Sequence, residues 1–227
     1  MRAGLAILAL ALAGAAAALG GAETGTGIAG TARVIDGDTL ALGPVRIRLH
    51  GIDAPELGQT CQGSDGAPWD CGAAAADRLA ALIAGRRVTC AAREADRYGR
   101  IVATCAADGI DLGHALVAEG LAWAFLRYSE DYVAAEADAR KIGAGLWQGD
   151  AAPAWDFRAA AWEAAAGAGP LPDCPIKGNI NRAGDRIYHM PWSRDYARTV
   201  IDEARGERWF CDEAEAEAAG WRAARGR

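Results

Sequence analysis

The sequence predicts an α+β fold in which short strands close into a small barrel, followed by a small C-terminal α/β module. Two observations lead to this prediction. Segments that alternate apolar and polar residues are short and closely spaced, with helical segments between them, which suggests a small closed barrel. The composition then changes after a linker, and a compact Trp- and Arg-rich segment begins at residue 173.

The N-terminal segment, residues 1–22, is apolar and contains a single charge, Arg2. It has a basic start, an apolar run over residues 5–19 and small residues near positions 20–22, as in a secretory signal peptide. The alternative is a membrane anchor, but the run is Ala-rich and short for a span of ~20 residues. We therefore expect the mature protein to be exported, periplasmic or secreted, with no membrane span.

Residues 33–55 are expected to form a β meander. RVIDGDTLAL alternates apolar and polar residues around the turn Asp36-Gly37, and Gly43-Pro44 turns the chain into VRIRLHGI, which alternates again. A loop rich in Gly, Ser, Asp and Pro follows over residues 58–70.

The next segments continue the mixture of helices and strands, with Gly85 and Gly120 as helix stops and Ser129 as an expected N-cap. In chain order, we expect a helix over 71–83, strands over 87–94 and 100–106, a helix over 112–119, a strand over 121–125 and a helix over 129–142.

These elements divide the chain into a barrel domain over 23–150, a helical extension and linker over 151–172, and a small module over 173–227. The net charge of −6 argues against broad coating of a phosphate backbone of the kind that basic proteins achieve. It is compatible with an enzyme that meets a phosphodiester at one focused site.

The six cysteines are even in number, and an oxidising compartment favours three disulfides. Cys90 and Cys105 each lie six residues from the turn Asp96–Gly99, so that they face one another if Asp96 pairs with Gly99. The other four cysteines bracket one loop and the tail. Separate buried thiols are the alternative, and zinc is disfavoured because no CxxC pair occurs. The expected disulfides are Cys90–Cys105, Cys61–Cys71 and Cys174–Cys211.

Four short motifs carry the chemistry, although each alone fits an ordinary turn or a solvated strand. Three carboxylates near strand ends suit a hard cation that prefers oxygen ligands. Two arginines beside them suit a phosphate, because the guanidinium fork matches its oxygens. Such a set is what phosphodiester hydrolysis requires. The motifs are Asp36-Gly37-Asp38-Thr39, Arg48, Asp53-Ala54-Pro55-Glu56 and Asp96-Arg97-Tyr98-Gly99-Arg100.

In order and spacing, VIDGDT, RLHGIDAPE and DRYGR resemble the signatures of the staphylococcal nuclease-like (thermonuclease) family, over about residues 31–147. The resemblance implies a five-stranded OB-fold β-barrel with about three helices that hydrolyses DNA or RNA using one Ca²⁺. It also implies direct attack by water, with a nucleic acid as the substrate.

The resemblance assigns the cation site by motif position. Asp38 and Asp53 resemble the carboxylate ligands of calcium, and Ala54 stands where the ligand is a backbone carbonyl. Because that ligand is main chain, alanine at this position is harmless. Asp36 is expected to shape the turn and to add negative field.

The catalytic roles follow in the same way. Glu56 resembles the general base, and Arg48 and Arg100 resemble the pair that clamps the scissile phosphate. Tyr98 and Tyr128 match tyrosines of the family's nucleotide pocket.

The sequence departs from the family pattern at two places. Leu126 stands where a ring is expected, and Trp123 or Phe125 is the candidate substitute, although both also suit the core. The segment from Cys61 to Cys71 is an insert where the family has a flexible lysine-rich loop.

The tail resembles a small module, sometimes called a sunset-type domain, that is appended to bacterial exported nucleases. Its pattern is also faintly similar to the zinc module of the Ada methyl-transfer proteins. That module needs four thiolates, whereas the tail offers Cys174, His189 and Cys211, so a disulfide is preferred.

Three functional hypotheses remain. The leading one is an exported, monomeric, Ca²⁺-dependent nuclease. The second is a catalytically silent nucleic-acid-binding OB module, and the third is a cell-envelope interaction protein acting through its tail. Such silent modules usually lose the carboxylates or the arginines, whereas all of them are present in this sequence. This favours the enzyme.

Overall fold

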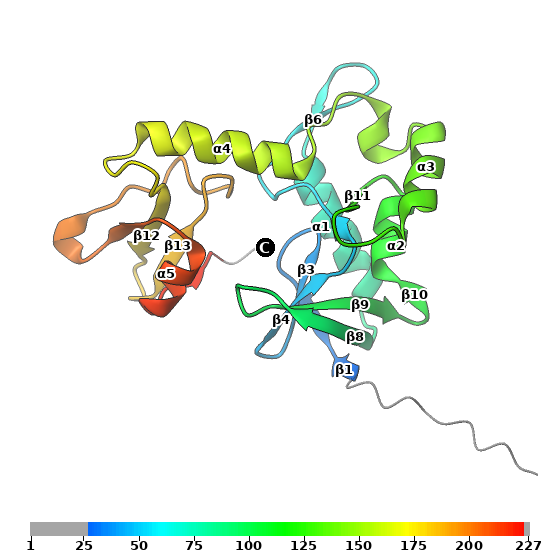
Figure 1. Cartoon of the computed structure of the whole chain (residues 1–227), viewed down its shortest axis with the longest axis horizontal. Coiled ribbons are helices and arrows are strands. Elements are labelled where there is room, and N and C mark those ends of the chain that lie inside the picture. Colours follow the sequence, from blue (N-terminus) through cyan, green and yellow to red (C-terminus); the bar gives the residue numbers. More distant parts are fainter. Residues whose placement is uncertain (1–26, 225–227) are drawn as a thin grey trace, which may run out of the picture.

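The computed structural model describes residues 27–224, so the expected signal peptide lies outside the described residues. Two bodies follow one another along the chain, and helix α4 (Ala154–Ala168) runs between them (Figure 1). The first is a curved sheet packed with helices, and the second is a small sheet with one helix. The expected α+β class is confirmed at this level.

The sheet of the first body runs in the order β1-β8-β9-β4-β3-β2, and an additional short strand pairs with β9. Its seven strands in the described part of the chain are β1 (Gly27–Gly30), β2 (Ala32–Val34), β3 (Thr39–Leu42), β4 (Val45–Leu49), β8 (Val88–Ala95), β9 (Ile101–Ala107) and β10 (Ile110–Asp111).

The sheet has more strands than the expected five, because β10 adds to β9 and because the first extended segment is divided into two strands. β1 and β2 are two halves of one extended segment interrupted at Thr31. β1 pairs antiparallel with β8, and β2 pairs antiparallel with β3, so this one segment bonds to both edges of the sheet. The sheet is thereby nearly closed into a barrel, which agrees with the expected architecture although not with the count.

The β8–β9 hairpin confirms the Cys90–Cys105 disulfide but corrects its derivation. Ala95 pairs with Ile101 and the Asp96 amide donates to the Arg100 carbonyl, so Asp96 faces Arg100 and not Gly99. A bulge between Ala92 and Glu94 shifts the register back by one residue. Cys90 therefore faces Cys105 after all, and their sulfurs are bonded.

Two short strand pairs lie beside the barrel. β5 (Ile52–Asp53) pairs with β11 (Trp123–Ala124), which replaces the longer strand expected over 121–125. β6 (Cys61–Gln62) pairs with β7 (Pro68–Trp69) inside the segment expected to be a loop, and the Cys61–Cys71 disulfide ties this ribbon to the next helix.

Helices α1 (Cys71–Ile83) and α2 (Leu112–Ala118) pack on the sheet, and α3 (Val133–Lys141) packs against α2 and β11. A short 3-10 helix, η1 (Gly145–Gln148), follows them. α3 begins later than expected, because the Ser129 hydroxyl accepts the Asp131 amide in a local turn and does not cap a helix. Tyr132, at the start of α3, is buried against Gly51 and Gly113.

The tail module is a four-stranded sheet in the order β14-β12-β13-β15 with helix α5 (Glu213–Ala218). Its strands are β12 (Ile176–Ile180), β13 (Arg186–His189), β14 (Arg208–Phe210) and β15 (Arg222–Ala223), with a 3-10 helix η2 (Glu203–Arg205) before β14. α5 is short, because the chain turns at Gly220 and adds β15 beside β13.

Cys174 and Cys211 form the third disulfide. Neither sulfur is then a thiolate, so the zinc-module alternative is wrong. Among residues 27–224, no helix is both long and apolar enough to cross a bilayer.

Candidate active site

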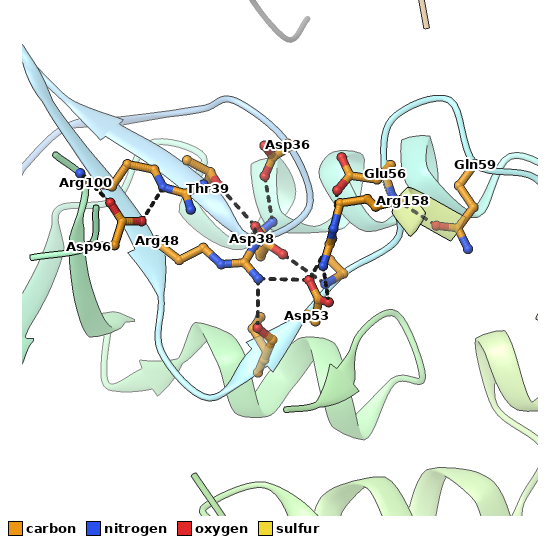
Figure 2. Close-up of polar contacts among 12 residues, drawn as sticks. Asp36, Asp38, Thr39, Arg48, Asp53, Glu56, Gln59, Asp96, Arg100 and Arg158 are labelled. Carbon is orange, nitrogen blue, oxygen red and sulfur yellow. Dashed lines mark hydrogen bonds and ion pairs between the residues drawn. The ribbon is translucent and has the colours of Figure 1, made fainter. Parts of the chain in front are cut away.

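The acidic and basic side chains of the motifs meet at one end of the barrel (Figure 2). Asp38 ends the turn between β2 and β3, Arg48 lies on β4, and Asp53 lies on β5. The register pairs Thr39 with Arg48, which brings the Asp38 turn beside the arginine. The predicted β meander therefore brings these three side chains together.

Asp38 is a buried carboxylate with all of its contacts inside the site. Its Oδ2 accepts the Ala54 amide at 2.9 Å, its Oδ1 accepts the Thr39 hydroxyl at 3.1 Å, and it forms an ion pair with Arg48. Burial alone would favour the neutral acid, but Arg48 and the Ala54 amide hold the pKa of Asp38 below its usual range. Asp38 therefore stays ionised.

Asp36 shapes the turn, as expected. Its Oδ1 accepts the Asp38 amide at 3.1 Å. Burial and the neighbouring Asp38 charge raise the pKa of Asp36 to about 7. The neutral form of Asp36 is therefore favoured unless positive charge is added beside it.

Asp53 is fully buried and accepts hydrogen bonds from two arginines. Arg48 Nη2 donates to Asp53 Oδ1 at 2.8 Å and to the Ile52 carbonyl at 3.3 Å. Arg158 Nη1 and Nη2 donate to Asp53 Oδ1 and Oδ2 at 3.1 and 2.7 Å. Both carboxylate oxygens are therefore engaged.

Glu56 stands at the edge of the site, where α1 fixes its backbone. A Cβ on Gly72 would lie 1.7 Å from the Glu56 carbonyl oxygen, so only glycine allows this approach. The Gln59 side chain accepts the Glu56 amide at 3.2 Å. Burial and the Asp36 charge raise the pKa of Glu56 to about 8, although Arg158, which donates to Glu56 Oε1 at 2.8 Å, opposes the rise.

Arg100 reaches the site from the start of β9. Its Nε donates to Asp96 Oδ2 at 2.7 Å, while Asp96 Oδ1 accepts the amides of Tyr98 and Arg100, both at 2.9 Å. The charge of Arg100 contributes to the lowered pKa of Asp38. Asp96 is therefore the residue that orients this arginine, a role that the hairpin-tip motif did not reveal.

A cleft of about 770 Å³ opens beside these residues, between the barrel and the tail module. Tyr98, Tyr128 and Phe125 line it from the barrel, and Trp192 and Arg194 line it from the tail. Trp123 is buried between Trp147 and Trp155 and so cannot replace the ring missing at position 126. Phe125 remains the candidate.

Arg158 also lies in the site, which the sequence analysis does not predict, because it assigns residues 151–172 to a helical extension and linker. The first turn of α4 packs on the barrel: Ala154 is buried in the cluster with Trp123 and Leu146, and Trp155 stacks on Phe125. A lone arginine close behind an aromatic residue in an Ala-rich helix was the available signal.

The donors suit a hard cation such as Ca²⁺. In the described residues, no group of three or more His, Cys, Asp or Glu side chains is arranged to hold a metal ion. However, Asp38 Oδ1 and Asp53 Oδ1 both contact the Arg48 guanidinium, so two buried carboxylates converge on one positive group. Two carboxylates, a backbone carbonyl and water are all oxygen ligands, which is what Ca²⁺ prefers.

The comparisons with known proteins agree with this geometry. The family model described as "Staphylococcal nuclease homologue" matches residues 46–149. A second model, described as ArfC, matches residues 154–223, so the sunset-type assignment of the tail is not confirmed.

Three relatives are similar to about half of the chain. The chain is 40% identical over 126 residues to the succinoglycan biosynthesis protein ExoI of Rhizobium meliloti (strain 1021), covering 53% of this chain and 65% of that protein. It is 37% identical over 134 residues to an uncharacterized endonuclease of Escherichia coli, covering 56% and 81%. It is 32% identical over 146 residues to the micrococcal nuclease of Shigella flexneri, covering 56% and 78%.

Proposed function

The chain belongs to the family of staphylococcal nuclease homologues, and on this premise we propose that it is an exported Ca²⁺-dependent nuclease that hydrolyses phosphodiester bonds of DNA or RNA. One observation carries the proposal. Arg48 contacts both Asp38 and Asp53, so a phosphate-binding arginine and two cation-binding carboxylates share a single site. The three disulfides support export, because they persist in oxidising compartments.

The cation would be held by Asp38, Asp53 and the Ala54 carbonyl. When bound, it would supply Lewis-acid stabilisation of the phosphate and a polarised water. Added positive charge beside Glu56 favours its ionised form, which is the form able to accept a proton. Glu56 then accepts the proton of the attacking water.

The arginines act on the phosphate. Arg48 and Arg100 neutralise the charge that grows on the equatorial oxygens, and Arg100 assists departure of the leaving oxygen. Asp96 holds Arg100 for this task. Tyr98 and Tyr128 offer rings at the cleft on which bases stack.

The two alternatives are less well supported. A silent binding module has no need of two buried carboxylates beside two arginines. If the tail acted alone on the cell envelope, there would be no reason for its residues to line the cleft of the barrel. Nor would there be a reason for Arg158, on the helix that leads to the tail, to contact Asp53.

Digestion of single-stranded DNA and RNA, with Ca²⁺ or with EDTA, tests the proposal. We expect activity with Ca²⁺, loss with EDTA, and loss by Glu56→Gln. The matched control is Glu119→Gln, which neutralises a carboxylate paired with Arg78 outside the cleft. Full activity in EDTA, or full activity of Glu56→Gln, contradicts the proposed mechanism.

A further inference from the structure

Arg158 brings a positive charge into the acidic site from outside the barrel (Figure 2). It donates to both oxygens of Asp53 and to one oxygen of Glu56, at distances between 2.7 and 3.1 Å. Asp53 is fully buried, and the Arg158 side chain is 24% exposed. Bidentate charge-assisted bonds of this kind are among the stronger polar contacts in proteins.

The docking of α4 fixes the place of Arg158. Ala154 and Trp155 precede it by four and three positions, so all three residues share one face of the helix. Trp155 stacks on Phe125 with ring centroids 5.6 Å apart, and the Gln59 amide donates to the Ala152 carbonyl at 2.6 Å. The guanidinium is thus held at Asp53 by a packed helix.

We propose that Arg158 sets the affinity of the cation site by competing with the divalent cation for Asp53, an inference that rests on the proposed function. A cation must coordinate at least one Asp53 oxygen, and Arg158 donates to each of them. Coordination therefore places the cation on an oxygen that Arg158 already bonds, so the two positive groups repel one another and compete for the same carboxylate. Arg158 is a resident counter-ion of the site.

The competition links the docking of α4 to the cation site. If docking of α4 weakens cation binding, cation binding must weaken the docking by the same factor. Arg158 also offsets the repulsion among Asp36, Asp53 and Glu56 when no divalent cation is bound. Its removal should therefore lower stability without Ca²⁺, and Ca²⁺ should restore it.

Calcium titration calorimetry on the full chain, after removal of metal by chelation, tests the competition. We expect Arg158→Gln to bind Ca²⁺ about tenfold more tightly than the wild type, which corresponds to one hydrogen bond between charged groups. Arg158→Lys keeps the charge and should fall between the two. The control is Arg78→Gln, which breaks a bidentate pair with Glu119 outside the cleft and should leave the affinity unchanged.

A second variant acts without touching the carboxylates. Trp155→Ala removes the ring that packs α4 on the barrel, and it should also tighten Ca²⁺ binding. Unchanged or weaker binding by a folded Arg158→Gln overturns the inference while leaving the proposed function intact, provided that the wild type binds Ca²⁺. Absence of Ca²⁺ binding in the wild type and in Arg158→Gln overturns both.

Discussion

The barrel and the tail module are stabilised in different ways. The barrel buries a continuous core from Leu40 to Ala135 and places the buried carboxylates Asp38 and Asp53 together in the site. Within residues 173–224, the core of the tail is one cluster of five buried apolar residues around Tyr188 and Phe210, and one disulfide is added. Small units with small cores commonly depend on such cross-links. We therefore expect the larger core of the barrel to offset the cost of its buried carboxylates, and the tail to depend more on its disulfide.

The largest effect is expected from the two arginines of the barrel. Arg48→Lys and Arg100→Lys each keep the charge but lose the bidentate fork, so activity should fall by ~10²-fold. Both variants should stay folded, although Arg48→Lys should lower the melting temperature of the barrel because Arg48 bonds two buried carboxylates. Nuclease assays with parallel thermal denaturation check this, and wild-type rates would mean that neither guanidinium contacts the phosphate.

The tail should be the more fragile body. Phe210 is fully buried in its small core, and Phe210→Ala should cost about 3–5 kcal/mol. We expect the tail to unfold first while the barrel keeps its circular dichroism signal. The matched change in the barrel is Leu40→Ala, which is also fully buried. A single cooperative transition in both variants would show that the two bodies do not differ as stated.

The barrel is also cross-linked, by the disulfide of the β8–β9 hairpin. Cys90 and Cys105 close a loop of 15 residues, so Cys90→Ala with Cys105→Ala should destabilise the barrel by about 3 kcal/mol. Because Arg100 lies on this hairpin, activity should also fall. Urea denaturation at constant Ca²⁺ measures the first effect, and an unaltered midpoint would rule out a stabilising role for the bond.

A buried carboxylate of the tail should have a smaller effect. Glu207 is 5% exposed and accepts the amides of Ile180 and Asp202, both at 2.9 Å. Glu207→Gln keeps one acceptor oxygen and should cost the tail about 1–2 kcal/mol. Glu203→Gln, at an exposed position on η2, serves as the control. Equal melting temperatures for the two variants would contradict this role.

The smallest effect concerns pH. Burial lowers the pKa of His189 below its usual value, and its Nε2 lies 3.0 Å from Asn179 Oδ1. The unfolded chain therefore binds a proton more readily than the folded tail, so stability is lost as the pH falls through the ordinary histidine range. We expect the melting temperature of the tail to drop between pH 7 and 5, and His189→Asn to flatten this dependence.

The proximity of the motif residues in the barrel could be predicted from the sequence. They lie on short strands, and the alternation of residues in such strands and the turns between them are local properties of the sequence. Asp38, Arg48 and Asp53 are close in the chain, and one meander brings them together. Arg158 could not be found in this way, since its contact with Asp53 depends on how α4 packs across the barrel. The bulge at Arg93 could not be predicted from the local sequence either. The predicted pairing of Asp96 with Gly99 is wrong by one residue, and the bulge shifts the register by one residue in the opposite direction, so that Cys90 still faces Cys105.

The divided strand β1–β2 makes the barrel vulnerable at its beginning. β1 covers the edge of β8, and its partners lie about 60 residues later in the chain. A protease that trims past residue 30 would uncover a row of unpaired amides and carbonyls along β8, a template for strand addition by another copy. If the chain is exported as proposed, the position of signal-peptide cleavage therefore affects aggregation as well as transport.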